Sequence, residues 1–77
     1  MITIYSTPSC PWCIRTKDFL KQHNISFTDI DVSKDRVGAM EMIRKSGQMG
    51  VPVIDIDGEI IIGFDKQRIS HLLNIKA

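Results

Sequence analysis

The feature that most constrains this chain is a cysteine pair with two residues between its members, Cys10-Pro11-Trp12-Cys13. These are the only two cysteines in the sequence. The preceding residues 2–5 alternate as in a β-strand, and residues 6–9 have the composition of a loop. Pro11 is favoured as the first residue of a helix, where its missing N–H is not needed. The sequence therefore predicts a strand, a loop and then a helix that begins at or beside Cys10.

A helix that begins there gives the two cysteines different roles. The Cys10 sulfur faces backbone N–H groups and the positive end of the helix dipole. These conditions favour the thiolate, which is the nucleophile in thiol–disulfide exchange. Two intervening residues in the first helical turn also bring Cys13 within disulfide range of Cys10. The motif in this strand-to-helix setting predicts a redox site.

Two other uses of the cysteine pair fit the sequence less well. A structural zinc site needs four ligands, and beyond the cysteines the chain offers only His23 and His71 as further histidine or cysteine ligands, at positions that match no zinc-finger spacing. A permanent structural disulfide across so short a loop gains little chain entropy. We therefore expect no metal at this site.

The composition predicts a single domain over residues 1–77, near the lower size limit for a self-sufficient core. The net charge is +1 with both signs mixed along the chain, so neither a nucleic-acid nor an anionic-membrane partner is expected. The apolar run at residues 60–62 is far too short to span a membrane, and no signal-peptide pattern is visible. Because a lone CxxC pair in such a chain is typical of reducing compartments, we expect a cytoplasmic protein, and nothing in the sequence suggests more than a monomer.

Hydrophobic spacing predicts the elements of the first half of the chain. The first helix is expected over residues 11–23, with Asn24 as its cap. The second strand is expected over residues 25–32, with a bend or bulge between Phe27 and Ile30 where the alternation changes phase. The residues of the first helix that are expected to face the core are Cys13, Thr16, Phe19 and Leu20.

The second half is expected to contain a helix, a hairpin and a last helix. Ser33 is the expected N-cap of the second helix, which ends before Gly47. Strands at residues 51–56 and 59–62 are joined by Asp57-Gly58, a strong hairpin signal. Asp65 is the expected cap of the last helix. The expected core residues are Val37, Met40 and Ile43 on the second helix, whose methionines are interpreted as core filler, and Ile69, Leu72 and Leu73 on the last one.

The order of elements is β-α-β-α-β-β-α. A helical crossover makes the first two strands parallel, and the hairpin adds an antiparallel pair. The expected fold class is therefore α/β, a thioredoxin-like fold in which three helices flank a four-stranded mixed sheet.

The chain resembles a glutaredoxin from end to end, on landmarks whose order and spacing are more specific than a lone CxxC. These landmarks are Ile4-Tyr5, Cys10-Pro11-Trp12-Cys13, Gly50-Val51-Pro52 and Gly63-Phe64-Asp65. The resemblance implies that Pro52 is cis and faces the cysteines, so that the Val51 backbone can pair with an incoming cysteinyl backbone. It also implies a glutathione groove, whose residues would be Trp12, Val51, Pro52, Gly63, Phe64 and Asp65.

The activity implied by the resemblance is that of a glutathione-linked thiol–disulfide oxidoreductase. Cys10 would be the nucleophile and Cys13 the resolving cysteine, with Pro11 holding the geometry of the motif. The substrates would be protein disulfides and glutathione mixed disulfides. The free N–H groups at the start of the last helix would suit a carboxylate of glutathione.

Two alternatives stay open at this stage. Some features are similar to glutaredoxin-like redoxins that are reduced by a flavoprotein, thioredoxin reductase, and donate electrons to ribonucleotide reductase. Some glutaredoxins instead carry an iron–sulfur cluster between two monomers, although Pro11 and the second cysteine argue against this role.

Overall fold

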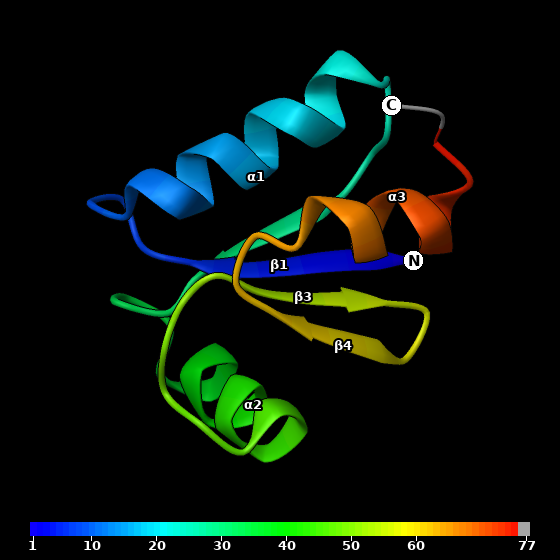
Figure 1. The fold of residues 1–77 in the computed structure, drawn as a ribbon. Coiled ribbons are helices and arrows are strands. Elements are labelled where there is room, and N and C mark those ends of the chain that lie inside the picture. Colours follow the sequence, from blue (N-terminus) through cyan, green and yellow to red (C-terminus); the bar gives the residue numbers. More distant parts are fainter. Residues whose placement is uncertain (76–77) are drawn as a thin grey trace.

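A mixed four-stranded sheet with strand order β2-β1-β3-β4 organises the molecule, and the computed structural model describes residues 1–75 (Figure 1). β1 pairs parallel with β2 and antiparallel with β3, and β3 pairs antiparallel with β4. The sequence thus predicted the fold class and the order of elements correctly. Within residues 1–75 the elements are β1 (Ile2–Ser6), α1 (Pro11–Gln22), β2 (Thr28–Asp31), α2 (Arg36–Ser46), β3 (Val53–Ile56), β4 (Glu59–Ile62) and α3 (Lys66–Leu73).

The core lies on both faces of the sheet because successive residues of its strands point to opposite sides. α1 and α3 cover one face and α2 covers the other (Figure 1). Ile4 and Ile54 pack with residues of α1 and α3, whereas their neighbours Tyr5 and Val53 pack against α2. The buried residues on the side of α1 and α3 are Ile4, Phe19, Leu20, Ile54, Ile56, Ile61 and Ile69.

The first helix has the buried face that its spacing predicts. Cys13, Thr16, Phe19 and Leu20 are all buried. The C-cap is His23, and Asn24 follows in the left-handed conformation with φ 57°. Asn24 therefore ends the helix in the way expected for that residue type.

The hairpin between β3 and β4 also forms where the sequence predicts it. Asp57 and Gly58 both have positive φ, 50° and 95°, as a two-residue turn of this kind requires. The Asp55 carboxylate accepts a hydrogen bond from the Gly58 N–H at 2.8 Å and braces the turn. β3 itself begins at Val53, so that Val51 and Pro52 lie in the preceding loop rather than in the strand.

The second helix differs from the prediction at its start. Its N-cap is Asp35, whose carboxylate accepts a hydrogen bond from the Gly38 N–H at 2.9 Å. The Ser33 hydroxyl instead donates to Asp31 at 2.5 Å. The expected N-cap at Ser33 was wrong because Asp31 engages that side chain, and the chain needs two more residues before it turns into the helix.

The second helix also presents a different face to the sheet. Met42 is 2% exposed, whereas Met40 is 66% and Val37 68% exposed. The cause is Gly38, because a Cβ at this position would lie only 2.5 Å from Cγ2 of Ile30. Because of this close approach, the side of α2 that carries Gly38 and Met42 faces the sheet. The core face predicted from Val37, Met40 and Ile43 was therefore wrong. Met42, and not Met40, lies in the core.

The second strand is shorter than predicted. It begins at Thr28, and the change of phase seen in the sequence marks this start. Ile25 and Phe27 lie before the strand and still pack against the core.

In the described part of the chain, no helix combines the length and the apolar character that crossing a membrane requires.

Candidate active site

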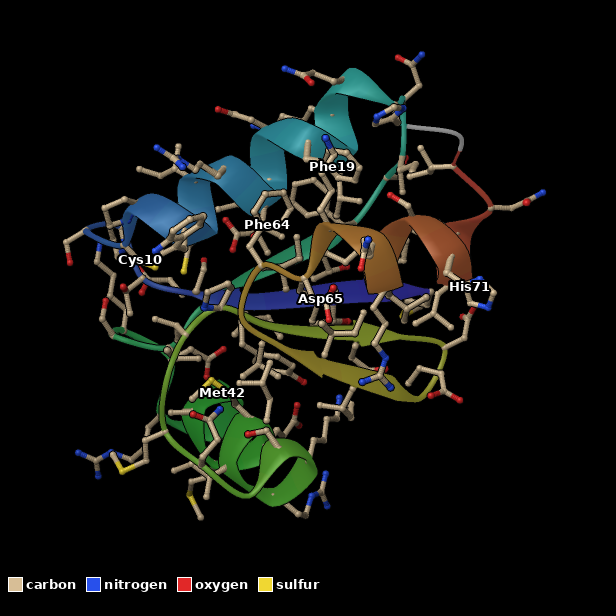
Figure 2. All side chains as sticks on the ribbon, in the orientation of Figure 1. Cys10, Phe19, Met42, Phe64, Asp65 and His71 are labelled. Carbon is tan, nitrogen blue, oxygen red and sulfur yellow. The ribbon has the colours of Figure 1, made fainter. Side chains whose placement is uncertain are left out.

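Cys10 occupies the N-cap of α1, as the sequence predicts. Its sulfur accepts a hydrogen bond from the backbone N–H of Cys13 at 3.2 Å, and Pro11 is the first helical residue. Figure 2 shows Cys10 at the end of the molecule where α1 begins. The side chain is partly exposed, so an approaching disulfide can reach the sulfur.

Cys13 lies one helical turn further on and is fully buried. Burial is the main cause that raises the pKa of the Cys13 thiol from 9.0 to about 11, and the hydrogen bond with Cys10 adds to the rise. The positive charge of Lys17 acts in the opposite direction. Cys13 is thus a protonated, shielded thiol at neutral pH, beside a partly exposed one at Cys10.

The loop that precedes β3 faces the Cys10 sulfur. The Val51–Pro52 peptide bond is cis, as the resemblance implies. The Val51 carbonyl oxygen lies 3.9 Å from the sulfur of Cys10. The Pro52 carbonyl accepts a hydrogen bond from the Gly63 N–H at 2.8 Å, which ties this loop to the segment that follows β4.

A hollow of about 230 Å³ opens beside these two segments. Its walls are Trp12, Val51, Pro52, Gly63 and Phe64, all of which the sequence assigns to the substrate groove. Trp12 is 54% exposed, and the centroid of its ring lies 6.3 Å from that of Phe64. The fold therefore brings together residues that are separated by up to 52 positions.

Asp65 stands beside this hollow without forming its wall. It is the N-cap of α3, and its carboxylate accepts a hydrogen bond from the Arg68 N–H at 3.1 Å. Figure 2 shows Asp65 at the start of α3, next to Phe64. Its structural role is to begin α3 directly after Phe64, the last residue that lines the hollow.

Two cations, which the sequence analysis did not assign to the site, flank the aromatic wall. The guanidinium carbon of Arg15 lies 4.9 Å from the centroid of the Trp12 ring, and Nζ of Lys66 lies 5.6 Å from that of Phe19. Phe64 packs edge-on against Phe19, with centroids 5.7 Å apart. A second hollow of about 320 Å³ shares Phe64 with the first, and its residues are Arg15, Asp18, Phe19, Gln22, Phe64 and Lys66. The only sequence signal for this extension was the closeness of Arg15 to the motif and of Lys66 to Asp65.

A polar network lies on the opposite side of α1. The Lys17 ammonium donates to the Ser6 hydroxyl at 3.2 Å and to the Asp29 carboxylate at 2.9 Å. The Ser6 hydroxyl donates to Asp29 at 2.7 Å. This network fixes the Lys17 charge close enough to influence the Cys13 thiol.

Nothing in residues 1–75 groups three histidine, cysteine or acidic side chains in a way that could hold a metal ion.

Comparison with known proteins gives a consistent result. The family model described as glutaredoxin matches residues 2–61. A protein of Clostridium pasteurianum, named an uncharacterized glutaredoxin-like 8.6 kDa protein in a rubredoxin operon, is 55% identical over 73 residues, which cover 95% of this chain and 97% of its own. Glutaredoxin 3 of Escherichia coli K12 is 36% identical over 64 residues, covering 83% of this chain and 77% of its own. The crystal structure of a mutant thioredoxin-like protein superposes with a TM-score of 0.92 at 35% identity and covers 97% of this chain and 96% of that one.

Proposed function

This chain belongs to the glutaredoxin family, and from that premise we propose that it is a dithiol thiol–disulfide oxidoreductase with glutathione as its co-substrate. The observation that carries the proposal is the pairing of a partly exposed Cys10 at a helix N-terminus with a buried Cys13 one turn away. This asymmetry suits a two-step exchange in which one thiol attacks and the other resolves.

In the first step the Cys10 thiolate attacks one sulfur of a disulfide. A new bond forms between Cys10 and that sulfur, the old disulfide bond breaks, and the second substrate sulfur leaves with the electron pair and takes up a proton. The hydrogen bond from the Cys13 N–H and the dipole of α1 stabilise the negative charge on the Cys10 sulfur before the attack.

In the second step Cys13 loses its proton and attacks the sulfur of Cys10. The disulfide between Cys10 and Cys13 forms, and the first substrate sulfur is released as a thiolate. Two glutathione molecules then return the protein to its dithiol form and become glutathione disulfide. With a glutathionylated substrate, Cys10 holds the glutathionyl group until a second glutathione removes it, and Cys13 is not needed.

The hollow beside Cys10 supports glutathione as the co-substrate. Trp12 and Phe64 form an aromatic wall, and the Val51 backbone lies beside the attacking sulfur. At the N-terminus of α3, next to Phe64, the Asp65 carboxylate takes the Arg68 N–H, and the remaining N–H groups of the first helical turn are the donors that a carboxylate of glutathione would use. Arg15 and Lys66 add positive charge at the outer end of the aromatic wall, where a second carboxylate of glutathione would be attracted.

A second candidate keeps the same chemistry and changes the electron donor. The relative from Clostridium pasteurianum is named for its place in a rubredoxin operon, and this redox setting is the reason to consider a donor other than glutathione. In this candidate a flavoprotein such as thioredoxin reductase reduces the Cys10–Cys13 disulfide, and ribonucleotide reductase is the acceptor class.

The test compares two reducing systems side by side. NADPH consumption is followed with a glutathionylated peptide as substrate, once with glutathione and glutathione reductase and once with thioredoxin reductase. The Cys10→Ser variant provides the background rate. Turnover that requires glutathione supports the first candidate, and turnover only with thioredoxin reductase replaces it with the second.

A further inference from the structure

In the loop that leads from α2 to the cis proline, the side chain of Gln48 binds the backbone of Gly50. The Gly50 N–H donates to Oε1 of Gln48 at 2.6 Å, and Nε2 of Gln48 donates to the Gly50 carbonyl at 3.0 Å. The carboxamide therefore satisfies both backbone groups of Gly50, as the backbone of a neighbouring antiparallel strand residue would do.

Gln48 is itself fixed to the end of α2. Its Nε2 donates to the Ser46 hydroxyl at 3.2 Å, and its backbone N–H points to the same oxygen at 3.4 Å. The Ser46 hydroxyl donates to the carbonyl of Met42 at 2.7 Å, and Met42 is buried in the core. The position of the carboxamide is thus set by the packed part of the molecule.

Glycine at position 50 leaves room for this arrangement. A Cβ atom there would lie 2.7 Å from Oε1 of Gln48, so with any other residue the carboxamide would have to move away from its present position. Gln48 and Gly50 therefore act as a matched pair, in which one residue supplies the carboxamide and the other leaves room for it.

The pair fixes the residue before Val51, and a second bond fixes the residue after it. The Pro52 carbonyl accepts the hydrogen bond from the Gly63 N–H at 2.8 Å. Val51 lies between these two anchors, with its carbonyl oxygen 3.9 Å from the Cys10 sulfur. Within residues 1–75 its backbone N–H makes no hydrogen bond, so one donor and one acceptor are presented next to the nucleophile.

We propose that Gln48 is a positioning residue, whose carboxamide holds Gly50 so that the Val51 backbone is presented to the backbone of the substrate cysteine. The inference rests on the proposed oxidoreductase function and deepens it, because it selects a substrate class. Disulfides of cysteinyl peptides, which carry backbone N–H and C=O groups beside the sulfur, use this edge. Disulfides without peptide groups do not use it.

The test measures single-turnover rates of the reduced protein with two disulfides. One is glutathione disulfide, a cysteinyl peptide, and the other is 5,5′-dithiobis(2-nitrobenzoate), which has no peptide group. Gln48→Ala is expected to lower the second-order rate constant with glutathione disulfide about tenfold. The reason is that the backbone hydrogen bonds between Val51 and the substrate are weakened, and the net contribution of such bonds corresponds to a rate change of this size. The rate with the aromatic disulfide is expected to stay within about twofold of wild type.

Three further variants sharpen the test. Gln48→Glu keeps the acceptor for the Gly50 N–H and loses the donor to the Gly50 carbonyl. Its rate with glutathione disulfide is therefore expected to fall between the rates of wild type and Gln48→Ala. This variant also tests the inference if Gln48→Ala does not fold. Gly50→Ala is expected to lower the peptide rate in the wild-type background and to have little further effect in Gln48→Ala. Met49→Ala changes an exposed neighbour that lies between the pair and is expected to match wild type.

The outcomes separate the inference from the proposed function. A wild-type protein that reduces neither disulfide overturns both. A wild type that reduces both disulfides, with a Gln48→Ala variant that is unchanged, overturns the inference alone. Equal losses with both disulfides also overturn it, since they assign Gln48 a general structural role.

Discussion

The backbone N–H of Cys13 points at the sulfur of Cys10, 3.2 Å away, while the Cys13 side chain itself is fully buried. One helical turn thus places the two sulfurs in opposite environments. The Cys10 sulfur lies at the positive end of the α1 dipole, and the Cys13 side chain lies in the apolar core. This difference in environment defines the expected behaviour of the two cysteine variants.

Cys10→Ser is expected to abolish turnover with every disulfide substrate, because the attacking sulfur is lost. Cys13→Ser is expected to keep the removal of glutathione from glutathionylated peptides and to lose at least about a hundredfold of protein-disulfide reduction, a loss typical of a missing catalytic group. Both activities are measured as NADPH consumption in the glutathione-coupled assay. Equal loss of both activities in Cys13→Ser would contradict the division of roles.

The stability of the reduced protein is expected to fall between pH 9 and pH 11 because of Cys13. Burial raises the pKa of this thiol from 9.0 to about 11, so above pH 9 the unfolded state releases the proton that the folded state retains. The stabilisation is complete below pH 9 and is lost as the pH rises through the folded-state pKa, by about 2–3 kcal/mol in the free energy of unfolding.

Urea unfolding of the reduced protein across this pH range measures the effect. Cys13→Ala has no thiol at this position, so the difference between its stability and that of wild type isolates the contribution of Cys13 from other titrating groups. A difference that does not change between pH 9 and pH 11 would contradict the assignment.

Trp12→Ala is expected to raise the KM for glutathione about tenfold and to leave the free energy of unfolding nearly unchanged. The Trp12 ring forms one wall of the hollow beside Cys10 and is more than half exposed, so it contributes to binding and little to the core. Steady-state kinetics at varied glutathione and thermal unfolding measure the two effects. Ile14→Ala is the matched control, because Ile14 is similarly exposed on α1 and lies outside this hollow.

Gly38→Ala is expected to destabilise the protein by about 1–2 kcal/mol, although alanine normally favours a helix over glycine. The added Cβ would lie 2.5 Å from Cγ2 of Ile30 and would push α2 away from the sheet. Urea unfolding measures the change, and Val37→Ala on the exposed side of the same helix is expected to stay within about 0.5 kcal/mol of wild type. An increase in stability of Gly38→Ala would show that the helix does not approach the sheet this closely.

The same glycine shows where prediction from sequence reached its limit. The Asp57-Gly58 turn and the Asp65 cap depend on neighbouring residues, and both were predicted correctly. The buried face of α2 depends on a contact between Gly38 and Ile30 on another element, and no local spacing reveals it. Hydrophobic periodicity therefore selected Val37 and Met40, which the fold leaves exposed.

In the candidate site, too, some residues could be recognised from local sequence, whereas others depend on tertiary contacts. The cysteine motif and the residues around Pro52 and Phe64 could be named as candidates from their sequence landmarks, and the fold places Trp12 of the motif, Pro52 and Phe64 around one hollow. Gln48 could not be assigned, because its bonds to Gly50 exist only once the loop has its final path. The contact of Arg15 with Trp12 likewise depends on side-chain conformations that a sequence does not specify.

The strand order has a consequence for how this molecule accommodates partners. β1 and β3 are the two central strands and pair antiparallel, so the end of β1 that leads to Cys10 and the start of β3 that follows Pro52 lie side by side at the same end of the sheet. The segment that carries Cys10 and the segment that carries Pro52 therefore both extend from one pair of hydrogen-bonded strands. They are not parts of two separate units that could move relative to each other. We therefore expect adaptation to partners of different shape to come from exposed side chains near the site, such as Trp12 and Arg15.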